Sequence, residues 1–244
     1  MKVLLAGSLC LILACAPRDS NGEPFTSPPS TSPPSTSRPS GDGSGTSVPL
    51  PPPRRSGDLS VEEALQRRRS VRSYRSAALS LEEIGQLLWA AQGITDQARG
   101  LRTAPSAGAT FPLEVYLLNS SAAHGLGAGV YRYRRDAHAL EPVIKGDRRD
   151  QLFRVSLRQS AITDAPVVMV ITAVPSRIEP RYGNLAPRFI AMEAGHAAQN
   201  VYLQSVPLGI GTVVIGAFDE AGVSEVLQLP HSERPLYILP IGKL

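Results

Sequence analysis

Residues 67–72 read Arg-Arg-Arg-Ser-Val-Arg and place four guanidinium groups and one hydroxyl within a single short turn. A guanidinium presents a rigid fork of donors that matches two oxygens of a phosphate, and a serine hydroxyl can complete such a shell. Short basic runs also occur on ordinary solvated surfaces. The stretch therefore leaves two interpretations open, a clamp for an anionic ligand and a solvated basic face.

Helix signals lie on both sides of this run. Ser60-Val61-Glu62-Glu63 is a capping box that opens a short helix ending at the basic residues. Ser80-Leu81-Glu82-Glu83 is a second box, and apolar residues follow it at helical spacing as far as Gly93. The rest of the pattern predicts strands at 113–118, 129–133, 139–143, 166–174, 211–217 and 236–241, and helices at 147–159, 189–206 and 219–227. We expect an α+β domain with a central mixed sheet of about five strands, flanked by helices.

The N-terminal residues have the pattern of a signal peptide. Lys2 precedes an apolar run at 3–13 that is too short to span a bilayer, and Ala14-Cys15 follows. This resembles a bacterial lipoprotein signal peptide (residues 1–14), whose cleavage would leave Cys15 as the lipidated first residue. An ordinary secretory signal or a misassigned start codon are the alternatives. The lipoprotein hypothesis implies an exported protein on the periplasmic side or cell surface, which contacts the membrane only through its N-terminal lipid.

Composition divides the remaining chain at residue 58. Residues 16–58 hold 11 of the 22 prolines, together with many Ser, Thr and Gly residues, so we expect a disordered tether at 15–58 and one domain at 59–244. The two cysteines are Cys10 and Cys15, which leaves none for a disulfide, a thiol nucleophile or a zinc site in that domain.

Two partner classes are not expected. The net charge is +4, but no long Lys/Arg stripe interleaved with aromatic residues supports nucleic-acid binding. The four histidines show no metal-ligand spacing, so no metal site is expected. His196 is expected on the interior side of helix 189–206, where Gln199 and Asn200 would serve in helix packing.

Two further segments are rich in small residues. Residues 104–109 read Ala-Pro-Ser-Ala-Gly-Ala, and residues 207–217 read Pro-Leu-Gly-Ile-Gly-Thr-Val-Val-Ile-Gly-Ala. Small side chains allow main chain to approach a flat ligand closely, and free N–H groups at a strand end can donate to it. Each segment alone is equally consistent with an ordinary turn.

The order of these motifs along residues 60–242 resembles the nitroreductase superfamily of FMN enzymes, and more narrowly its SagB-type, thiazoline-oxidase-like dehydrogenases. The order is Arg-Arg-Ser-x-Arg, Pro-Ser-x-Gly, Gly-His-x-x-Gln-Asn, Leu-Gly-Ile-Gly-Thr and a final Pro-Ile-Gly. The resemblance implies a nitroreductase-like fold in an intertwined homodimer with FMN bound at the interface.

The resemblance also implies roles for individual residues. The FMN phosphate, the ribityl chain and the polar edge of the ring would be held by Arg68, Arg69, Ser70 and Arg72. The isoalloxazine would be contacted from the partner subunit by Pro105, Ser106, Ala107 and Gly108. Main-chain N–H groups near N5 and O4 would come from Ile215 and Gly216.

Two departures from the family pattern matter. The chain stops at Leu244 without the usual basic tail, so Lys243 would stand in for it at the phosphate. The Lys-Tyr pair of SagB-type azoline oxidases corresponds here to Arg181-Tyr182. An arginine does not release its proton near neutral pH, which argues against base catalysis at that position. Tyr182 is a candidate general acid or proton relay, with a structural tyrosine as the alternative.

The sequence therefore predicts an FMN-dependent oxidoreductase that moves two electrons through bound flavin and acts on an unidentified small molecule. The alternatives are a lipid-anchored flavin-binding protein without turnover and an azoline dehydrogenase of modified peptides.

Overall fold

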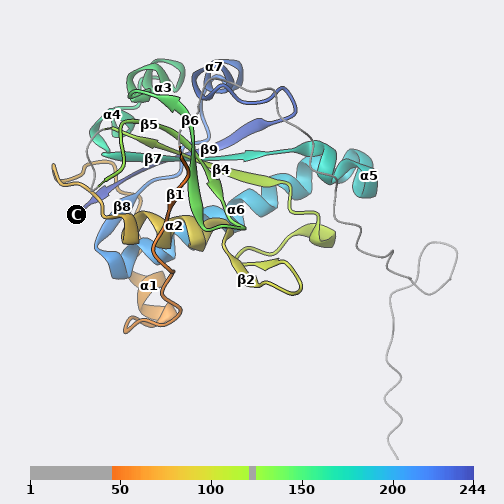
Figure 1. Ribbon diagram of the computed structural model, residues 1–244, viewed down its shortest axis with the longest axis horizontal. Coiled ribbons are helices and arrows are strands. Elements are labelled where there is room, and N and C mark those ends of the chain that lie inside the picture. Colours follow the sequence, from red (N-terminus) through yellow and green to blue (C-terminus); the bar gives the residue numbers. More distant parts are fainter. Residues whose placement is uncertain (1–45, 121–124) are drawn as a thin grey trace, which may run out of the picture. The chain divides into compact units, whose positions relative to one another are not determined.

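The computed structural model describes residues 46–120 and 125–244. Their central sheet has the strand order β1-β6-β5-β4-β7-β9-β8, and every named pair is antiparallel (Figure 1). The strands are β1 (Val48–Pro49), β4 (Leu113–Asn119), β5 (Gly129–Arg134), β6 (Ala139–Lys145), β7 (Val167–Ala173), β8 (Ile210–Thr212) and β9 (Arg234–Lys243). The parallel element is an isolated bridge between Ser70 and Thr212 beside β8. The α+β fold is confirmed, and the short edge strand β1 was not expected.

Helices lie on both faces of this sheet. They are α1 (Val61–Arg67), α2 (Leu81–Gln92), α3 (Arg149–Val155), α4 (Ala161–Asp164), α5 (Glu179–Tyr182), α6 (Ala186–Ser205) and α7 (Glu220–Leu227). A two-stranded ribbon, β2 (Ile94–Asp96) and β3 (Leu101–Arg102), follows α2. Figure 1 shows α2 and α6 on one side of the sheet and α3 and α7 on the other.

Alternation along the central strands builds a core on each face. Val115 packs in the cluster that includes α2 and α6, whereas its neighbour Tyr116 packs in the cluster that includes α3, α4 and α7. All seven residues of β7 are buried, as its continuous β-branched run predicted. Each fully buried aliphatic side chain of this kind stabilises the fold by roughly 1.5–3 kcal/mol.

The predicted strand at 211–217 is shorter than expected, because β8 ends at Thr212. In the register set by the pairs Thr212–Ile241 and Ile215–Ile238, Val213 faces Pro240, which has no N–H to donate. The N–H of Val214 leaves the ladder and donates to the Tyr202 hydroxyl at 2.9 Å.

The folded domain also begins earlier than residue 59, so the predicted end of the tether is wrong. Val48 and Pro49 pair with β6, Leu50 is buried in the core, and the N–H of Arg54 donates to Gln86 at 2.7 Å. Proline is tolerated on an edge strand, and for that reason a Pro-rich segment can still pair. Cys15 and the signal segment lie outside the described residues.

Within residues 46–120 and 125–244, no helix has the length and apolarity needed to cross a membrane. The same residues contain no cluster of His, Cys, Asp and Glu suited to a metal ion.

Candidate functional site

The basic run follows the end of α1. Two of its arginines contact α1 itself, and a third contacts α6. Arg67 forms an ion pair with Glu63 one turn earlier, and Arg69 donates at 2.8 Å to the carbonyls of Gln66 and Arg68. These two side chains complete the C-terminal end of their own helix. Arg68 instead places its guanidinium 5.1 Å from the centre of the Tyr202 ring. Arg72 is exposed.

Ser70 lies at the centre of this group. Its hydroxyl is 3.1 Å from the Tyr202 hydroxyl, which also accepts from the N–H of Val214. The main chain beside it is fixed by a bond from the N–H of Val71 to the carbonyl of Thr212 at 2.8 Å. The turn after α1, the last part of α6 and the chain after β8 therefore meet at one place.

The segment after β8 offers one main-chain donor where two were expected. The N–H of Ile215 donates to the carbonyl of Ile238 at 2.8 Å, so it is not free for a ligand. Gly216 is exposed, and its N–H has no acceptor within the described part of the chain. The donor expected near a flavin N5 is therefore Gly216, because the bridge to β9 uses the N–H of Ile215.

Lys243, expected to replace a basic tail, pairs with Glu83 of α2. Glu83 also accepts from the N–H of Ser80 in the capping box at 2.9 Å. The ammonium group is thus already neutralised by one carboxylate.

The small-residue turn forms a second group with α5. Gly108, in the short 3₁₀ helix η1 (Ala107–Ala109), has φ +59°, and an added Cβ would lie 2.8 Å from both the Tyr182 hydroxyl and the Nε of Arg181. Arg181 donates to the Gly108 carbonyl at 3.3 Å, and Tyr182 packs edge to face on Phe189 at 4.7 Å. The structure thus brings the predicted turn and the predicted Tyr182 together.

A buried carboxylate that the sequence reasoning missed faces the same turn. Glu193 of α6 is 2% exposed, and neither of its oxygens receives a well-formed hydrogen bond. Burial raises the pKa of Glu193, while the nearby Ser106 hydroxyl, Arg102 and the Ala107 N–H act in the opposite direction. Its interior position on α6 could be read from the helical period, but its direction toward the turn could not.

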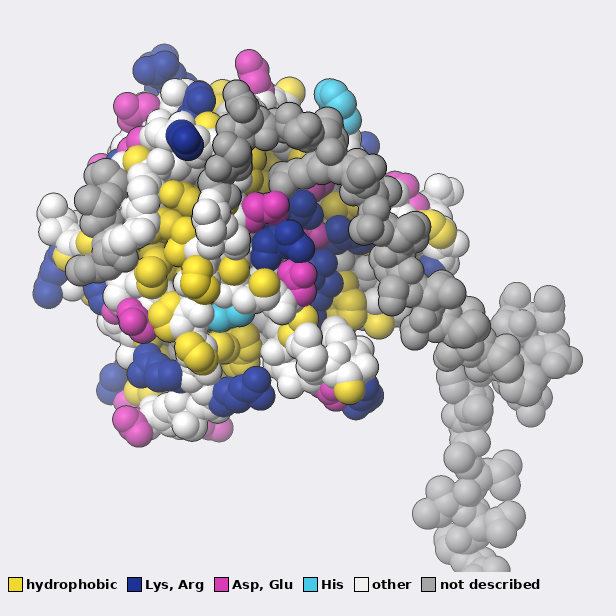
Figure 2. All heavy atoms as spheres, in the orientation of Figure 1, with side chains coloured by type: hydrophobic (Ala, Val, Ile, Leu, Met, Phe, Trp, Pro, Cys, Tyr) yellow, Lys and Arg dark blue, Asp and Glu magenta, His cyan; other side chains and the backbone are white. Residues whose placement is uncertain are grey.

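A second unpredicted cluster surrounds Glu114, which is 2% exposed. Arg132 and Arg135 each lie 3.1 Å from one of its oxygens, and Arg177 lies 2.6 Å from the other. Burial raises the pKa of Glu114, but these three charges outweigh it and lower the pKa to about 2. Burial and the charge of Arg135 lower the pKa of Arg102 to about 9. Figure 2 shows basic and acidic side chains interleaved near the middle of the displayed face.

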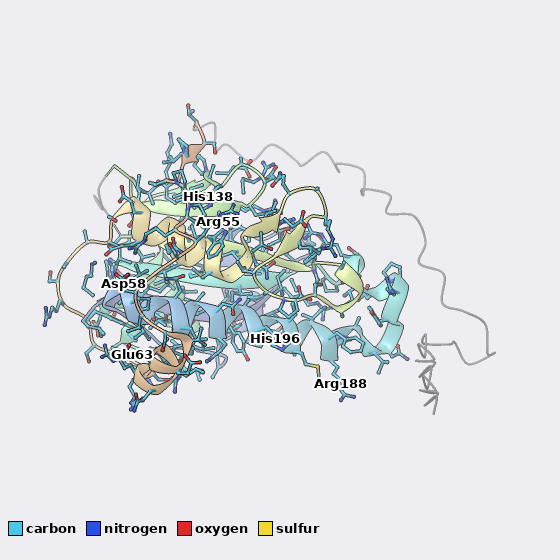
Figure 3. All side chains as sticks on the ribbon, turned by 90° about the horizontal axis from the view of Figure 1, so that it is seen from below. Arg55, Asp58, Glu63, His138, Arg188 and His196 are labelled. Carbon is cyan, nitrogen blue, oxygen red and sulfur yellow. The ribbon has the colours of Figure 1, made fainter. Side chains whose placement is uncertain are left out.

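Two expectations for α6 have different outcomes. Asn200 has a packing role, because it donates to the carbonyl of Thr103 at 3.2 Å. His196 is exposed, which corrects the prediction that it faces the interior. The buried stripe of α6 passes through Ile190, Ala194 and Ala197, and His196 lies on the other side of the helix. In Figure 3 His196 and Arg188 lie along this helix.

The two groups of predicted site residues lie along different parts of α6. Glu193, near the middle of the helix, belongs to the group around the turn, and Tyr202, near its C-terminal end, belongs to the group around the basic run. The two residues are nine positions apart, which corresponds to about 14 Å along a helix axis. The described part of one chain therefore presents two separate groups of candidate residues, called the candidate half-sites below.

Comparison with known families identifies the family of this chain. A model described as the nitroreductase family matches residues 65–243. The chain belongs to the nitroreductase family. Its members are oxidoreductases, and this family match covers both candidate half-sites.

Individual relatives are consistent with the match. A protein of Methanocaldococcus jannaschii assigned as a nitroreductase is 41% identical over 186 residues, which cover 76% of this chain and 92% of that protein. A crystal structure assigned as a nitroreductase from Ralstonia eutropha JMP134 has a TM-score of 0.73 at 31% identity, covering 84% of this chain and 93% of that one. A chain of the E. coli microcin synthetase McbBCD complex, solved with truncated pro-MccB17 bound, has a TM-score of 0.64 at 25% identity and covers 82% and 79%.

Proposed function

We propose that this nitroreductase-family protein is an FMN-dependent oxidoreductase that passes two electrons between a small-molecule substrate and a separate acceptor. The observation that carries the proposal is the meeting of Arg68 and Ser70 at Tyr202, whose hydroxyl also accepts from the N–H of Val214, two residues before the exposed Gly216. Members of this family typically use flavin.

The residues present fit such a cofactor. Two arginines and one serine hydroxyl that are not consumed by α1 match the oxygens of a phosphate. Gly216 supplies an exposed main-chain donor for a ring nitrogen or carbonyl oxygen. The side chains of Arg181 and Tyr182 fill the space beside Gly108, so a flat ring would pack on another side of this turn, where its other small residues carry little side-chain bulk.

Bound FMN would supply the hydride chemistry, accepting two electrons from one substrate and giving them to a second. The residues of this chain bind and orient it. The N–H of Gly216 would stabilise charge that develops at the polar edge of the ring, and the Tyr182 hydroxyl would hold or donate a proton. An arginine side chain has no acceptor position, and Arg181 is therefore assigned to binding.

The site requires a second copy of this chain in the proposed account. The two candidate half-sites lie at different positions along α6, so the turn of one protomer would meet the basic run of its partner. Exposed apolar side chains that a homodimer would cover lie on α1 (Val61, 64%; Leu65, 52%), on α6 (Met192, 47%) and at the residue that precedes α6 (Leu185, 53%).

A SagB-type dehydrogenase is the finer assignment that we favour. The similarity to a chain of the microcin synthetase complex supports it and keeps an azoline dehydrogenase of modified peptides as a second candidate. Arg181 in place of lysine weighs against base catalysis in that reaction. A flavin-binding protein without turnover is the third candidate. The ion pair between Lys243 and Glu83 favours this candidate, because a neutralised Lys243 contributes less to a phosphate site.

Cys15 is proposed as a lipid anchor on an exported protein, with residues before the domain as a tether. An exported site would meet little NAD(P)H, and a substrate oxidation that passes electrons to a quinone or to oxygen therefore fits better than nicotinamide-driven reduction.

Stopped-flow spectroscopy of the FMN-loaded protein tests turnover. We expect candidate donors to bleach the flavin spectrum under anaerobic conditions and a soluble quinone to restore it. A flavin that binds but is bleached only by dithionite would favour the non-catalytic alternative, and bleaching by a thiazoline-containing peptide would favour the azoline candidate.

A further inference from the structure

The turn after α1 has a rigid main chain and one adjustable donor. The N–H of Val71 is bonded to Thr212, and the hydroxyl of Tyr74 donates to the carbonyl of Val71 at 2.8 Å. Thr212 in turn donates from its hydroxyl to the carbonyl of Pro240 at 2.8 Å. With the backbone fixed in this way, what remains to be set at Ser70 is the rotation of its side chain and hydroxyl.

Tyr202 sets that rotation. Its oxygen accepts the N–H of Val214 at 2.9 Å and lies 3.1 Å from the hydroxyl oxygen of Ser70. The two hydroxyl groups hold two hydrogens, and one of them is used in the bond between the groups. Either hydroxyl could donate in this bond. Because the Val214 N–H already fills an acceptor position on the tyrosine oxygen, the favoured arrangement has the hydrogen of Tyr202 directed to Ser70, which leaves the hydrogen of Ser70 to donate outward.

The Tyr202 ring also holds the charged side chain of Arg68 in place. The guanidinium of Arg68 lies 5.1 Å from the centre of the Tyr202 ring, within the range of a cation–π contact. A side chain on the long helix of the domain thus holds both a donor hydroxyl and a guanidinium in the same place, before any ligand arrives.

We propose that Tyr202 is a positioning residue for the phosphate end of the site, acting through Ser70 by orienting its hydroxyl as a donor to a phosphate oxygen. This inference rests on the proposed function and adds a residue that the motif pattern did not include. Tyr202 itself does not need to touch the ligand. Its loss should therefore weaken recognition of the phosphate and leave recognition of the flavin ring in place.

Paired titrations of the full protein with FMN and with riboflavin, which lacks the phosphate, separate these effects. For Tyr202→Phe we expect the dissociation constant for FMN to rise about fivefold more than that for riboflavin, the effect of one lost hydrogen bond. Ser70→Ala should show the same selective loss, and the double variant should lose less than the sum of the single losses, since both act in one pair. Tyr131→Phe, which removes a donor from β5 to Gly127 in the segment just before that strand, is the matched control and should alter neither constant.

Each of the following results would overturn the inference. Equal weakening of FMN and riboflavin would make Tyr202 a general structural support, and additive losses in the double variant would show that it does not act through Ser70. Wild-type protein that binds neither FMN nor riboflavin would contradict both the proposed function and this inference. If wild type binds FMN and Tyr202→Phe leaves the ratio of the FMN and riboflavin dissociation constants unchanged, the inference alone is contradicted.

Discussion

The hydroxyl of Tyr182 lies 2.8 Å from the position that a Cβ atom would occupy at Gly108. Gly108 also has φ +59°, a left-handed backbone conformation that residues other than glycine adopt with strain. The turn and α5 therefore pack closely because Gly108 has no side chain.

Gly108→Ala should accordingly destabilise the turn and displace Tyr182 or Arg181. We expect a loss of more than about 1 kcal/mol in the free energy of unfolding, which is the cost of the left-handed conformation alone. Gly100→Ala is the matched control, because Gly100 has φ +64° but nothing within 4 Å of the added Cβ. Urea unfolding that gives equal losses in the two variants would show that the contact with α5 carries no weight.

The cluster around Glu114 predicts an acid-sensitive part of the stability. Its pKa is lowered to about 2 in the folded protein from 4.5 in the unfolded chain, so the carboxylate stabilises the fold above about pH 4.5 and that stability is lost as the pH falls toward 2. The difference corresponds to about 3 kcal/mol.

Glu114→Gln should therefore be less stable than wild type by about that amount at pH 7, with a difference that shrinks as the pH falls from 4.5 to 2. Chemical unfolding at a series of pH values measures this. Glu225→Gln, on the exposed side of α7, is the control. A difference between wild type and Glu114→Gln that stays constant across this range would contradict the assigned ion pairs.

Glu193 predicts the opposite pH dependence. Burial raises the pKa of Glu193 in the folded protein. The protonated carboxyl group therefore favours the folded state, and this stability is lost as the pH rises through the raised pKa. Glu193→Gln, which keeps the shape without the charge, should be more stable than wild type at pH 8 and closer to it at pH 4. Thermal unfolding at both values checks this, and a gain that is the same at both would show that the carboxyl group does not titrate in this range.

The exposed apolar surface of α1 and α6 predicts a dimer. Met192→Glu should shift the mass measured by light scattering from two protomers toward one, because a buried unpaired charge opposes association. Leu157→Glu is the control, since Leu157 is 71% exposed at the end of α3, away from these helices. A wild-type protein that is monomeric at every concentration would refute the shared site.

The sequence predicted the elements with strong periodicity and missed contacts that depend on the third dimension. α1 and α2 begin after Ser60 and Ser80 as expected, because each serine accepts from the N–H of the glutamate three residues later. At α2 the reciprocal bond of the capping box is also present, whereas at α1 the Glu63 side chain pairs with Arg67. The end of β8 depends on Pro240, which faces it from another strand, and no local window contains both.

The candidate site shows the same division. Motif order found Ser70, Gly108 and Tyr182, whose surroundings the structure now describes. It did not find Tyr202 or Glu193, because both lie on α6 among ordinary helix residues and their roles follow from the direction of one side chain. The N–H of Ile215 was assigned from strand position, and the bond to Ile238 on β9 corrects it.

FMN retention tests the central claim most directly. The purified protein is incubated with FMN, passed through gel filtration and examined by visible absorption, beside a variant that combines Arg68→Ala with Arg72→Ala. We predict that the wild type keeps the flavin bands at one FMN per protomer and that the variant loses them. A colourless wild-type protein would contradict the account and leave the basic run at 67–72 as a solvated surface.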